Sequence, residues 1–343
     1  MKRKSDNLSP YFETIKKPTI YYNFVFQIYY YNKYSFSTSY TSLKIFREIV
    51  CIPSVPGDRY IVLAKNITQW KNRNFTPILF FNFKDQSNIN KYLESINDSV
   101  YYITYDFDAP ASSGIARTAI FAFCARYQFK SHTKIAFCDD RRLIKFSLVE
   151  NYNPINDINM IDIMYYEMAG KNILIYWAQG ETKNIFNQPR GIKKTIKQLH
   201  IKAALDLSKR GQVFFSTIDN MRTIWQKLII KGIDGLASPL GGDYYLSSVL
   251  PLGTEEISEY CARYAPDKSL ESVARPKIFN DTGIDFTTMT TRIINILTHP
   301  IARKCAESAF RILLTDSSIG KKIIDNVADF ESHHIYAKQL NLI

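Results

Sequence analysis

Short apolar runs alternate with amphipathic stretches from Phe46 to about residue 140, and this pattern predicts a sheet with helices packed on it. The predicted strands are 48–52, 77–83, 100–104 and 134–138. The predicted helices between them are 58–72, 88–96 and 114–127. Strands that alternate with helices of about ten to fifteen residues are typical of βαβ units. The expected fold class is therefore α/β and Rossmann-like, with a mostly parallel central sheet and helices on both faces.

The pattern differs on either side of this core. Residues 1–45 are polar at first and then rich in tyrosine, and the alternation through Ile20–Tyr30 is compatible with a strand. Helices are predicted near the other end at 287–297, 301–314 and 318–330. The expected organisation is an aromatic-rich extension (1–45), a core (46–250, with halves 46–145 and 146–250) and a helical C-terminal region (251–343).

Polar clusters follow the predicted strands. In a parallel sheet the carboxyl ends of the strands share one edge, and ligands bind there. The clusters contain Pro53, Ser54, Val55 and Arg59; Lys84 and Asp85; Gly114 and Arg117; and Asp139, Asp140 and Arg141. Arginine pairs well with phosphate, amides at a helix start favour anions, and adjacent carboxylates suit Mn²⁺ or Mg²⁺. Taken singly, each cluster is weak evidence: an aspartate at a strand end such as Asp139 is more often a turn or helix-cap residue, and an isolated Arg117 is more often a surface residue.

The order of these clusters resembles GT-A glycosyltransferases, most closely the phage group that glycosylates modified DNA bases. The matching segments are Pro53-Ser54 with Arg59, Gly114-Ile115-Ala116-Arg117, Asp139-Asp140-Arg141, the strand-like run 212–218, and Gly241-Gly242-Asp243 before an expected acceptor-side helix. The resemblance covers about 200 of the 343 residues, and its motifs are short.

The resemblance implies a GT-A fold and a hexosyltransferase that moves a sugar from a donor such as UDP-glucose to an acceptor hydroxyl. The nucleotide-sugar-binding residues would be Pro53, Ser54, Val55, Arg59, Asp85, Gly114, Arg117, Asp139, Asp140 and Arg141. Asp139 and Asp140 would hold a divalent metal, Mn²⁺ or Mg²⁺. Asp243 would be the catalytic base of an inverting enzyme, or would position the acceptor in a retaining one. A helix N-cap is the alternative role for Asp243.

Two departures from the family pattern leave other functions open. Arg141 stands at the last position of the triplet, where the family pattern expects a carboxylate, so it could itself neutralise the diphosphate, and metal dependence is uncertain. Gly242 stands where a glutamate is expected. The alternatives are a catalytically decayed scaffold that binds nucleic acid, a glycosyltransferase with a protein or glycan acceptor, and a nucleotidyltransferase that would use Asp106 and Asp108 as further metal ligands.

The net charge of +12 is concentrated in one part of the chain. Residues 183–231 hold eleven Lys and Arg against two acidic residues. Such a segment suits a polyanion such as DNA, because binding releases counterions, but it is also compatible with a solvated basic face. Trp225, Phe214 and Phe215 lie in the same segment and are expected in the core.

Other features suggest the setting of the protein. The five cysteines are scattered without a CxxC pair, which favours reduced thiols. The basic first residues are not followed by the apolar region of a signal peptide, and no stretch is long and apolar enough to cross a membrane. A cytoplasmic location is expected, in the host cytoplasm if the chain is of phage origin. His333 and His334 are expected to be two neighbouring surface residues.

Overall fold

A computed structural model of the chain describes most of the predicted core and the C-terminal helices. The described residues are 24–54, 60–107, 113–138, 144–148, 161–162, 165–166, 168–169, 176–177, 213–249, 260–264, 286–315, 319–327 and 330–343.

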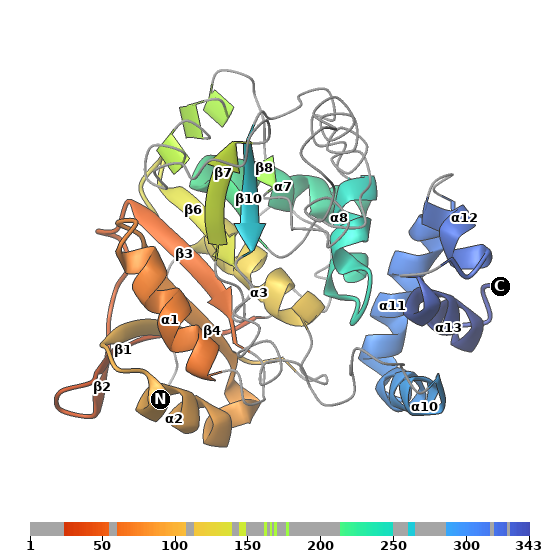
Figure 1. The fold of residues 1–343 in the computed structure, drawn as a ribbon, viewed down its shortest axis with the longest axis horizontal. Helices are drawn as coiled ribbons and strands as arrows, with labels where there is room; N and C mark the ends of the chain where they lie inside the picture. The colour runs from red at the N-terminus through yellow and green to blue at the C-terminus, as the bar shows by residue number, and fades with distance from the viewer. Residues whose placement is uncertain are drawn as a thin grey trace, which may run out of the picture.

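One eight-stranded sheet organises the molecule, in the order β2-β1-β5-β4-β3-β6-β9-β8 (Figure 1). Its strands are β1 (Phe26–Asn32), β2 (Ser37–Tyr40), β3 (Glu48–Pro53), β4 (Thr76–Asn82), β5 (Val100–Tyr105), β6 (Lys134–Cys138), β8 (Tyr176–Trp177) and β9 (Val213–Thr217). The central strands β5, β4, β3 and β6 are parallel to one another. β7 (Ile144–Leu148) and β10 (Tyr260–Tyr264) form a separate antiparallel pair.

The four central strands coincide with the four predicted apolar runs, and the α/β class with a parallel centre is confirmed. The flanking strands are antiparallel: β1 pairs with β5, and β9 pairs with β6. β1 and β2 lie within residues 1–45, and the tyrosines there form cross-strand pairs. The ring of Tyr29 stacks on Tyr102 with centroids 4.9 Å apart, and Tyr30 lies 4.9 Å from Tyr101. Such aromatic pairs stabilise neighbouring strands.

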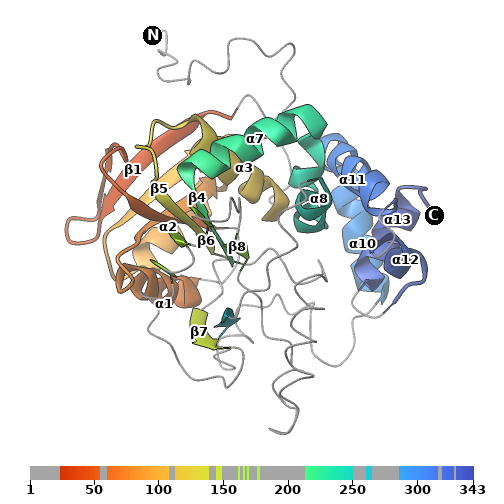
Figure 2. The same ribbon diagram turned by 90° about the horizontal axis from the view of Figure 1, so that it is seen from above.

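Helices cover both faces of the sheet (Figure 2). α1 (Tyr60–Lys71) and α2 (Gln86–Ser95) pack on one face through a cluster that includes Leu63, Trp70 and Tyr92. α3 (Ser113–Arg126) and α7 (Ile218–Lys231) pack on the other. The buried residues of α3 include alanines at 116, 119, 122 and 125, whose small side chains let the helix lie close to the strands. Helical cover on two faces agrees with the sequence-based expectation.

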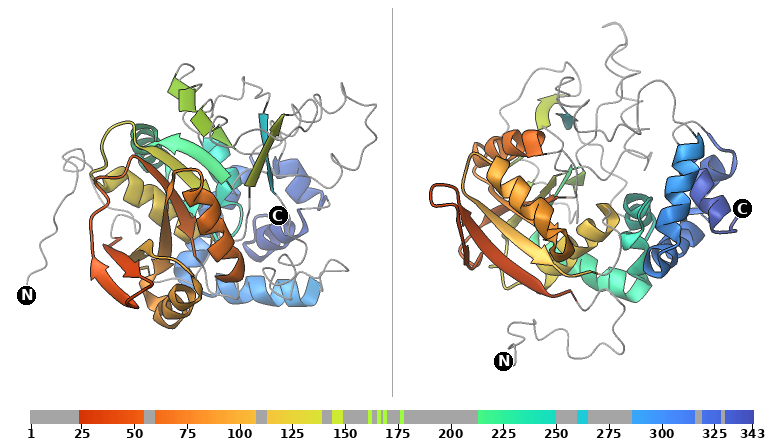
Figure 3. Two further views of the ribbon diagram at one scale, coloured as in Figure 1. Left: turned by 60° about the vertical axis from the view of Figure 1, so that its left-hand side comes forward. Right: turned by 90° about the horizontal axis from the view of Figure 1, so that it is seen from below.

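The C-terminal helices lie beside the sheet, beyond α8 (Gly242–Val249) (Figures 1 and 3). They are α10 (Phe286–Leu297), α11 (Pro300–Leu313), α12 (Ile319–Ile324) and α13 (Glu331–Gln339). α11 packs against α8 and against the short 3-10 helix η5 (Asp234–Ala237). An ion pair between Lys304 and Asp234, 3.4 Å apart, joins α11 to η5.

The predicted helix 318–330 is wrong in its second half. α12 ends at Ile324, and Asn326 has a φ of 51°. The Val327 amide donates to the Lys322 carbonyl across this turn at 3.1 Å. Asparagine tolerates the left-handed region that closes a helix in this way. The chain therefore turns before α13 begins.

Candidate functional site

The order of the parallel strands defines one edge position at which a ligand crevice is expected. From β3 the chain crosses through α1 to β4 and through α2 to β5, on one face of the sheet. From β5 it crosses through α3, on the opposite face, to β6 on the other side of β3. The strand order therefore reverses at β3, with β4 on one side and β6 on the other, and the connecting helices change faces there, which is a topological switch point. The loops after β3 and β6 flank it, and they contain two of the predicted clusters.

The β3 end of this edge is built by Pro53 and Ser54, both of which are buried. The Ser54 amide donates to the Phe80 carbonyl at 2.9 Å and so extends the pairing of β3 with β4. The Ser54 hydroxyl is buried without a hydrogen-bond partner among the described residues. A buried hydroxyl without a partner is costly, which makes Ser54 a candidate for contact with a ligand or with the loop that follows. Val55 and Arg59 lie outside the described residues.

The end of β4 carries a polar residue that the sequence reading did not single out. Asn82 is 3% exposed. Its side-chain amide donates to the Phe107 carbonyl at 3.1 Å, and its Oδ1 accepts from the Lys84 amide at 3.2 Å. Asn82 therefore ties the loop after β4 to the loop after β5. An amide residue that closes an otherwise apolar run is the signal that could have identified it.

Asp85 closes the short 3-10 helix η3 (Phe83–Asp85), directly after β4. The structure therefore places its backbone at the expected edge. Its side chain is outside the described part of the molecule, and its predicted contact with a base or ribose stays a prediction.

Arg117 reaches from α3 toward the end of β6. Its side chain is 7% exposed, and its guanidinium lies 5.6 Å from the centre of the Phe137 ring, the penultimate residue of β6. The structure thus brings the predicted Arg117 beside the strand that leads into Asp139, Asp140 and Arg141. These three residues lie outside the described residues.

The space left by the missing side chain at Gly114 is occupied by another part of the protein and not by solvent. A Cβ atom there would lie 2.0 Å from the Ser238 carbonyl oxygen. The first turn of α3 therefore touches the turn that leads from η5 into α8. This contact connects the predicted donor side of the site with the predicted acceptor side.

On the predicted acceptor side, close packing of the backbone explains why residue 242 is a glycine. A Cβ atom at Gly242 would lie 2.4 Å from the Leu236 carbonyl, and Gly241 has a φ of 79°. The glutamate of the family pattern does not fit this backbone. α8 begins at Gly242, so Asp243 stands in its first turn rather than at the N-cap position. The side chain of Asp243 is not among those described.

A metal at this edge would depend on Asp139 and Asp140, which directly follow β6. Among the described residues there is no group of three His, Cys, Asp or Glu that could hold a metal ion. Carboxylate oxygens are the ligands that Mn²⁺ and Mg²⁺ prefer, so the chemistry of the two aspartates fits the expected ion. Asp106 directly follows β5, three strands away from β6, a separation of about 14 Å at the usual strand spacing. That distance disfavours a metal shared by Asp106 and Asp139.

The basic segment is described only in part. Residues 183–212 lie outside the described residues. Trp225, Phe214 and Phe215 are at most 1% exposed, so the expectation that they belong to the core is confirmed. On α7, Arg222 pairs with Asp219 at 3.3 Å and also donates to the Phe129 carbonyl. Arg222 therefore fastens α7 to the core.

The expectation of two surface histidines is wrong for His333. This side chain is 5% exposed and is surrounded by the rings of Tyr244, Phe310 and Phe330, with centroids 5.2–6.1 Å away. α13 orients residue 333 toward α8 and α11. The presence of two adjacent histidines in the sequence does not indicate this orientation. His334 points elsewhere, with its Nδ1 2.8 Å from the Ile323 carbonyl.

Comparison of the chain with models of known protein families gives no match, and comparison with curated protein sequences gives none either. None of the helices in the described part of the chain is long and apolar enough to span a bilayer.

Proposed function

We propose that the protein is a GT-A glycosyltransferase that binds a nucleoside diphosphate sugar at the switch point between β3 and β6. The observation that carries the proposal is the position of two family-like motifs relative to the strand order. The motifs Pro53-Ser54 and Asp139-Asp140-Arg141 lie at the ends of β3 and β6 in the sequence, and these neighbouring strands flank the edge position where such sheets bind ligands.

The diphosphate is proposed to lie between the start of α3 and the end of β6. Arg117, already held beside Phe137, and Arg59 stabilise the charge that develops on the leaving diphosphate. Ser54 supplies a buried hydroxyl to the nucleotide side of the same edge. Asp139 and Asp140 would hold Mn²⁺ or Mg²⁺, which supplies further positive charge to the diphosphate when bound. Arg141 is the residue that would take this role in a metal-independent enzyme.

Transfer joins an acceptor oxygen to the anomeric carbon as the bond from that carbon to the diphosphate breaks. In an inverting reaction Asp243 takes the proton of the acceptor hydroxyl, and in a retaining reaction it positions the acceptor. The close contact of Gly242 with Leu236 supports an acceptor side built without a glutamate. The departure from the family pattern at Gly242 therefore has a packing reason that does not require loss of function.

The acceptor is proposed to be a hydroxyl of DNA, such as that of a hydroxymethylated base. The support is the excess of Lys and Arg over 183–231. Binding through phosphate contacts weakens steeply with salt. If a DNA duplex binds equally well at low and at high salt, DNA is ruled out as the acceptor, and a protein or glycan acceptor is favoured instead.

The donor site is tested by thermal shift with nucleoside diphosphates and nucleotide sugars, each with and without Mn²⁺. A ligand that binds the folded state raises the melting temperature. We expect one nucleotide to do so, and Arg117→Lys to weaken its binding about tenfold or more, because lysine lacks the two-pronged guanidinium. Arg126→Lys is the matched control, since Arg126 lies at the other end of the same helix, where it donates to the Phe24 carbonyl.

Catalysis is tested separately, by the release of nucleoside diphosphate from the donor that binds. Asp243→Asn should lower this release while donor binding is unchanged. A nucleotide that binds without any turnover would identify a decayed scaffold. If no nucleotide binds, or if Arg117→Lys binds as the wild type does, the donor site proposed here is wrong.

A further inference from the structure

A pocket opens at the opposite edge of the sheet from the proposed donor site. Its volume is about 430 Å³, within the usual range for small-molecule sites. It is lined by the starts of β4 and β5, by Tyr30 of β1, and by residues just after α1 and just before β5. β4 runs for seven residues, about 20 Å, between this edge and the switch point. The pocket is therefore separate from the proposed donor site.

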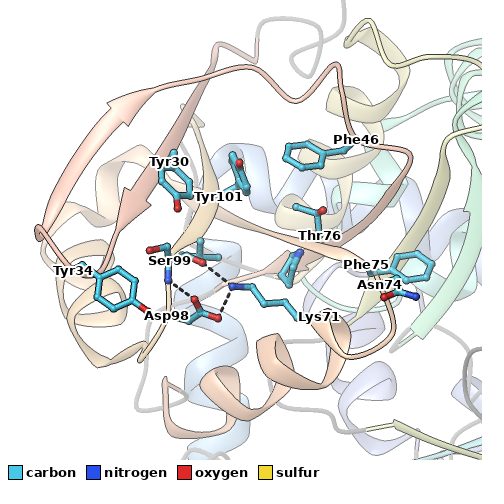
Figure 4. Close-up of a pocket in the computed structure, with 12 residues that line it drawn as sticks. Tyr30, Tyr34, Phe46, Lys71, Asn74, Phe75, Thr76, Asp98, Ser99 and Tyr101 are labelled. Atoms are coloured by element: carbon cyan, nitrogen blue, oxygen red, sulfur yellow. Dashed lines mark hydrogen bonds and ion pairs between the residues drawn. The ribbon is translucent and has the colours of Figure 1, made fainter.

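One wall of the pocket is aromatic. The ring of Tyr101 lies 4.9 Å from that of Tyr30 and 4.9 Å from that of Phe46, so the three form a continuous row (Figure 4). Tyr34 stands at the rim and is 91% exposed. Tyrosine offers an apolar ring face together with a hydroxyl that donates and accepts hydrogen bonds. The wall thus suits a ligand that is itself a ring with an apolar face and polar edges.

The facing wall is polar, and its positive and negative charges sum to zero (Figure 4). Lys71 and Asp98 are its charged members, and they form an ion pair. Lys71 also donates to the Ser99 carbonyl at 2.9 Å, and Asp98 accepts from the Ser99 amide at 2.7 Å. The two side chains are held in place yet stay 36% and 44% exposed, so they keep capacity for hydrogen bonds with a ligand.

We propose that this pocket binds a neutral sugar ring, independently of the donor site. A pyranose has an apolar face that can pack on the Tyr30–Tyr101–Phe46 row. Its hydroxyls both donate and accept, and they meet an acceptor in Asp98 and a donor in Lys71. An ionised ligand is disfavoured because the two charges cancel. A nucleic acid chain is disfavoured for the same reason, since its binding requires excess positive charge along the backbone.

The test is saturation-transfer NMR on the full chain with methyl β-D-glucopyranoside, methyl β-D-galactopyranoside and cellobiose, and with adenosine and uridine as the alternatives. Few polar contacts and a small ligand make a dissociation constant of about 1 mM the expected scale. Asp98→Asn should weaken sugar binding about tenfold, because the charged acceptor is lost while the side chain can still accept from Ser99. Tyr101→Leu should weaken it by at least a similar factor through loss of the wall.

Matched controls separate the pocket from general effects. Asp325→Asn removes a carboxylate from the Lys321–Asp325 pair, in which Asp325 is 45% exposed, close to the 44% of Asp98. Tyr166→Leu removes a tyrosine that is 82% exposed and outside the pocket. Both should bind sugar as the wild type does. If Tyr101→Leu fails to fold, Asp98→Asn decides the question alone.

Three results would overturn the proposal: no transfer to any sugar, transfer that is unchanged in Asp98→Asn, or nucleoside binding that is sensitive to Asp98→Asn while no sugar binds. Nucleotide binding at the donor site should be unchanged in Asp98→Asn. The failure of this proposal and the failure of the proposed function are therefore separate outcomes.

Discussion

His333 is an ionisable side chain enclosed almost entirely by aromatic rings. Neither ring nitrogen has a hydrogen-bond partner among the described residues. Burial without such partners lowers its pKa to about 4. The neutral form therefore packs α13 against α8 and α11, and the protonated form is disfavoured in the folded state.

This gives the folded protein a dependence on pH. The pKa of an unfolded histidine is near 6.5, so as the pH falls below that value the unfolded chain takes up a proton that the folded chain does not. Stability is then lost progressively between about pH 6.5 and pH 4. From pH 7.5 to pH 5 the expected loss from His333 is about 2 kcal/mol. Urea unfolding of the wild type and of His333→Leu at the two pH values measures it.

His333→Leu should be close to the wild type in stability at pH 7.5, because an apolar side chain suits the surrounding rings. It should show a smaller loss at pH 5. His334→Gln is the control, since His334 is only partly buried and contacts the Ile323 carbonyl. An unchanged pH dependence in His333→Leu would contradict the assignment.

At the scale of elements, the contact between α3 and the turn into α8 connects the two sides of the candidate site. Gly114→Ala would place a methyl group against the Ser238 carbonyl, 2.0 Å from the oxygen. In an ordinary helix interior this change stabilises by up to about 1 kcal/mol. Here we expect destabilisation by about 2 kcal/mol or more, because backbone must move. We also expect weaker nucleotide binding than in an alanine variant of the exposed Lys91 on α2.

Denaturant unfolding and the nucleotide thermal shift measure the two effects of Gly114→Ala. A variant as stable as the wild type would mean that α3 and the turn are not held together as described. Stability that falls while nucleotide binding is retained would mean that this contact does not shape the proposed donor site.

The central elements could be predicted from sequence because buried strands and helices have characteristic local patterns of apolar and polar residues. β3 to β6 are covered on both faces, so each is an apolar run bounded by polar residues. β8 is two residues long and leaves no such pattern. The candidate loops could be placed at one edge because parallel strands share a direction. The contact of Gly114 with Ser238 joins positions 124 apart in the chain. No local pattern encodes such a contact, and the same holds for the burial of His333.

At the scale of the whole molecule, one hydrophobic cluster runs from the sheet into the C-terminal helices. It includes Phe24 before β1, Ile120 of α3, Trp225 of α7 and Phe310 of α11. Phe310 is fully buried, and its ring stacks on Tyr336 with centroids 5.7 Å apart. Because the cluster is continuous, we expect the C-terminal helices to unfold together with the sheet rather than before it.

Phe310→Ala tests this continuity. Removal of a buried phenylalanine ring is expected to lower the free energy of unfolding by about 3–5 kcal/mol. If the molecule unfolds as one unit, the fluorescence of Trp70, Trp177 and Trp225 and the circular dichroism of the helices should shift together to lower urea concentration. Ile312→Ala on the same helix, at a position 40% exposed, should cause a much smaller shift. Helical signal that is lost at lower urea than the tryptophan signal would show instead that α10–α13 unfold separately, and that α11 does not depend on the sheet for its stability.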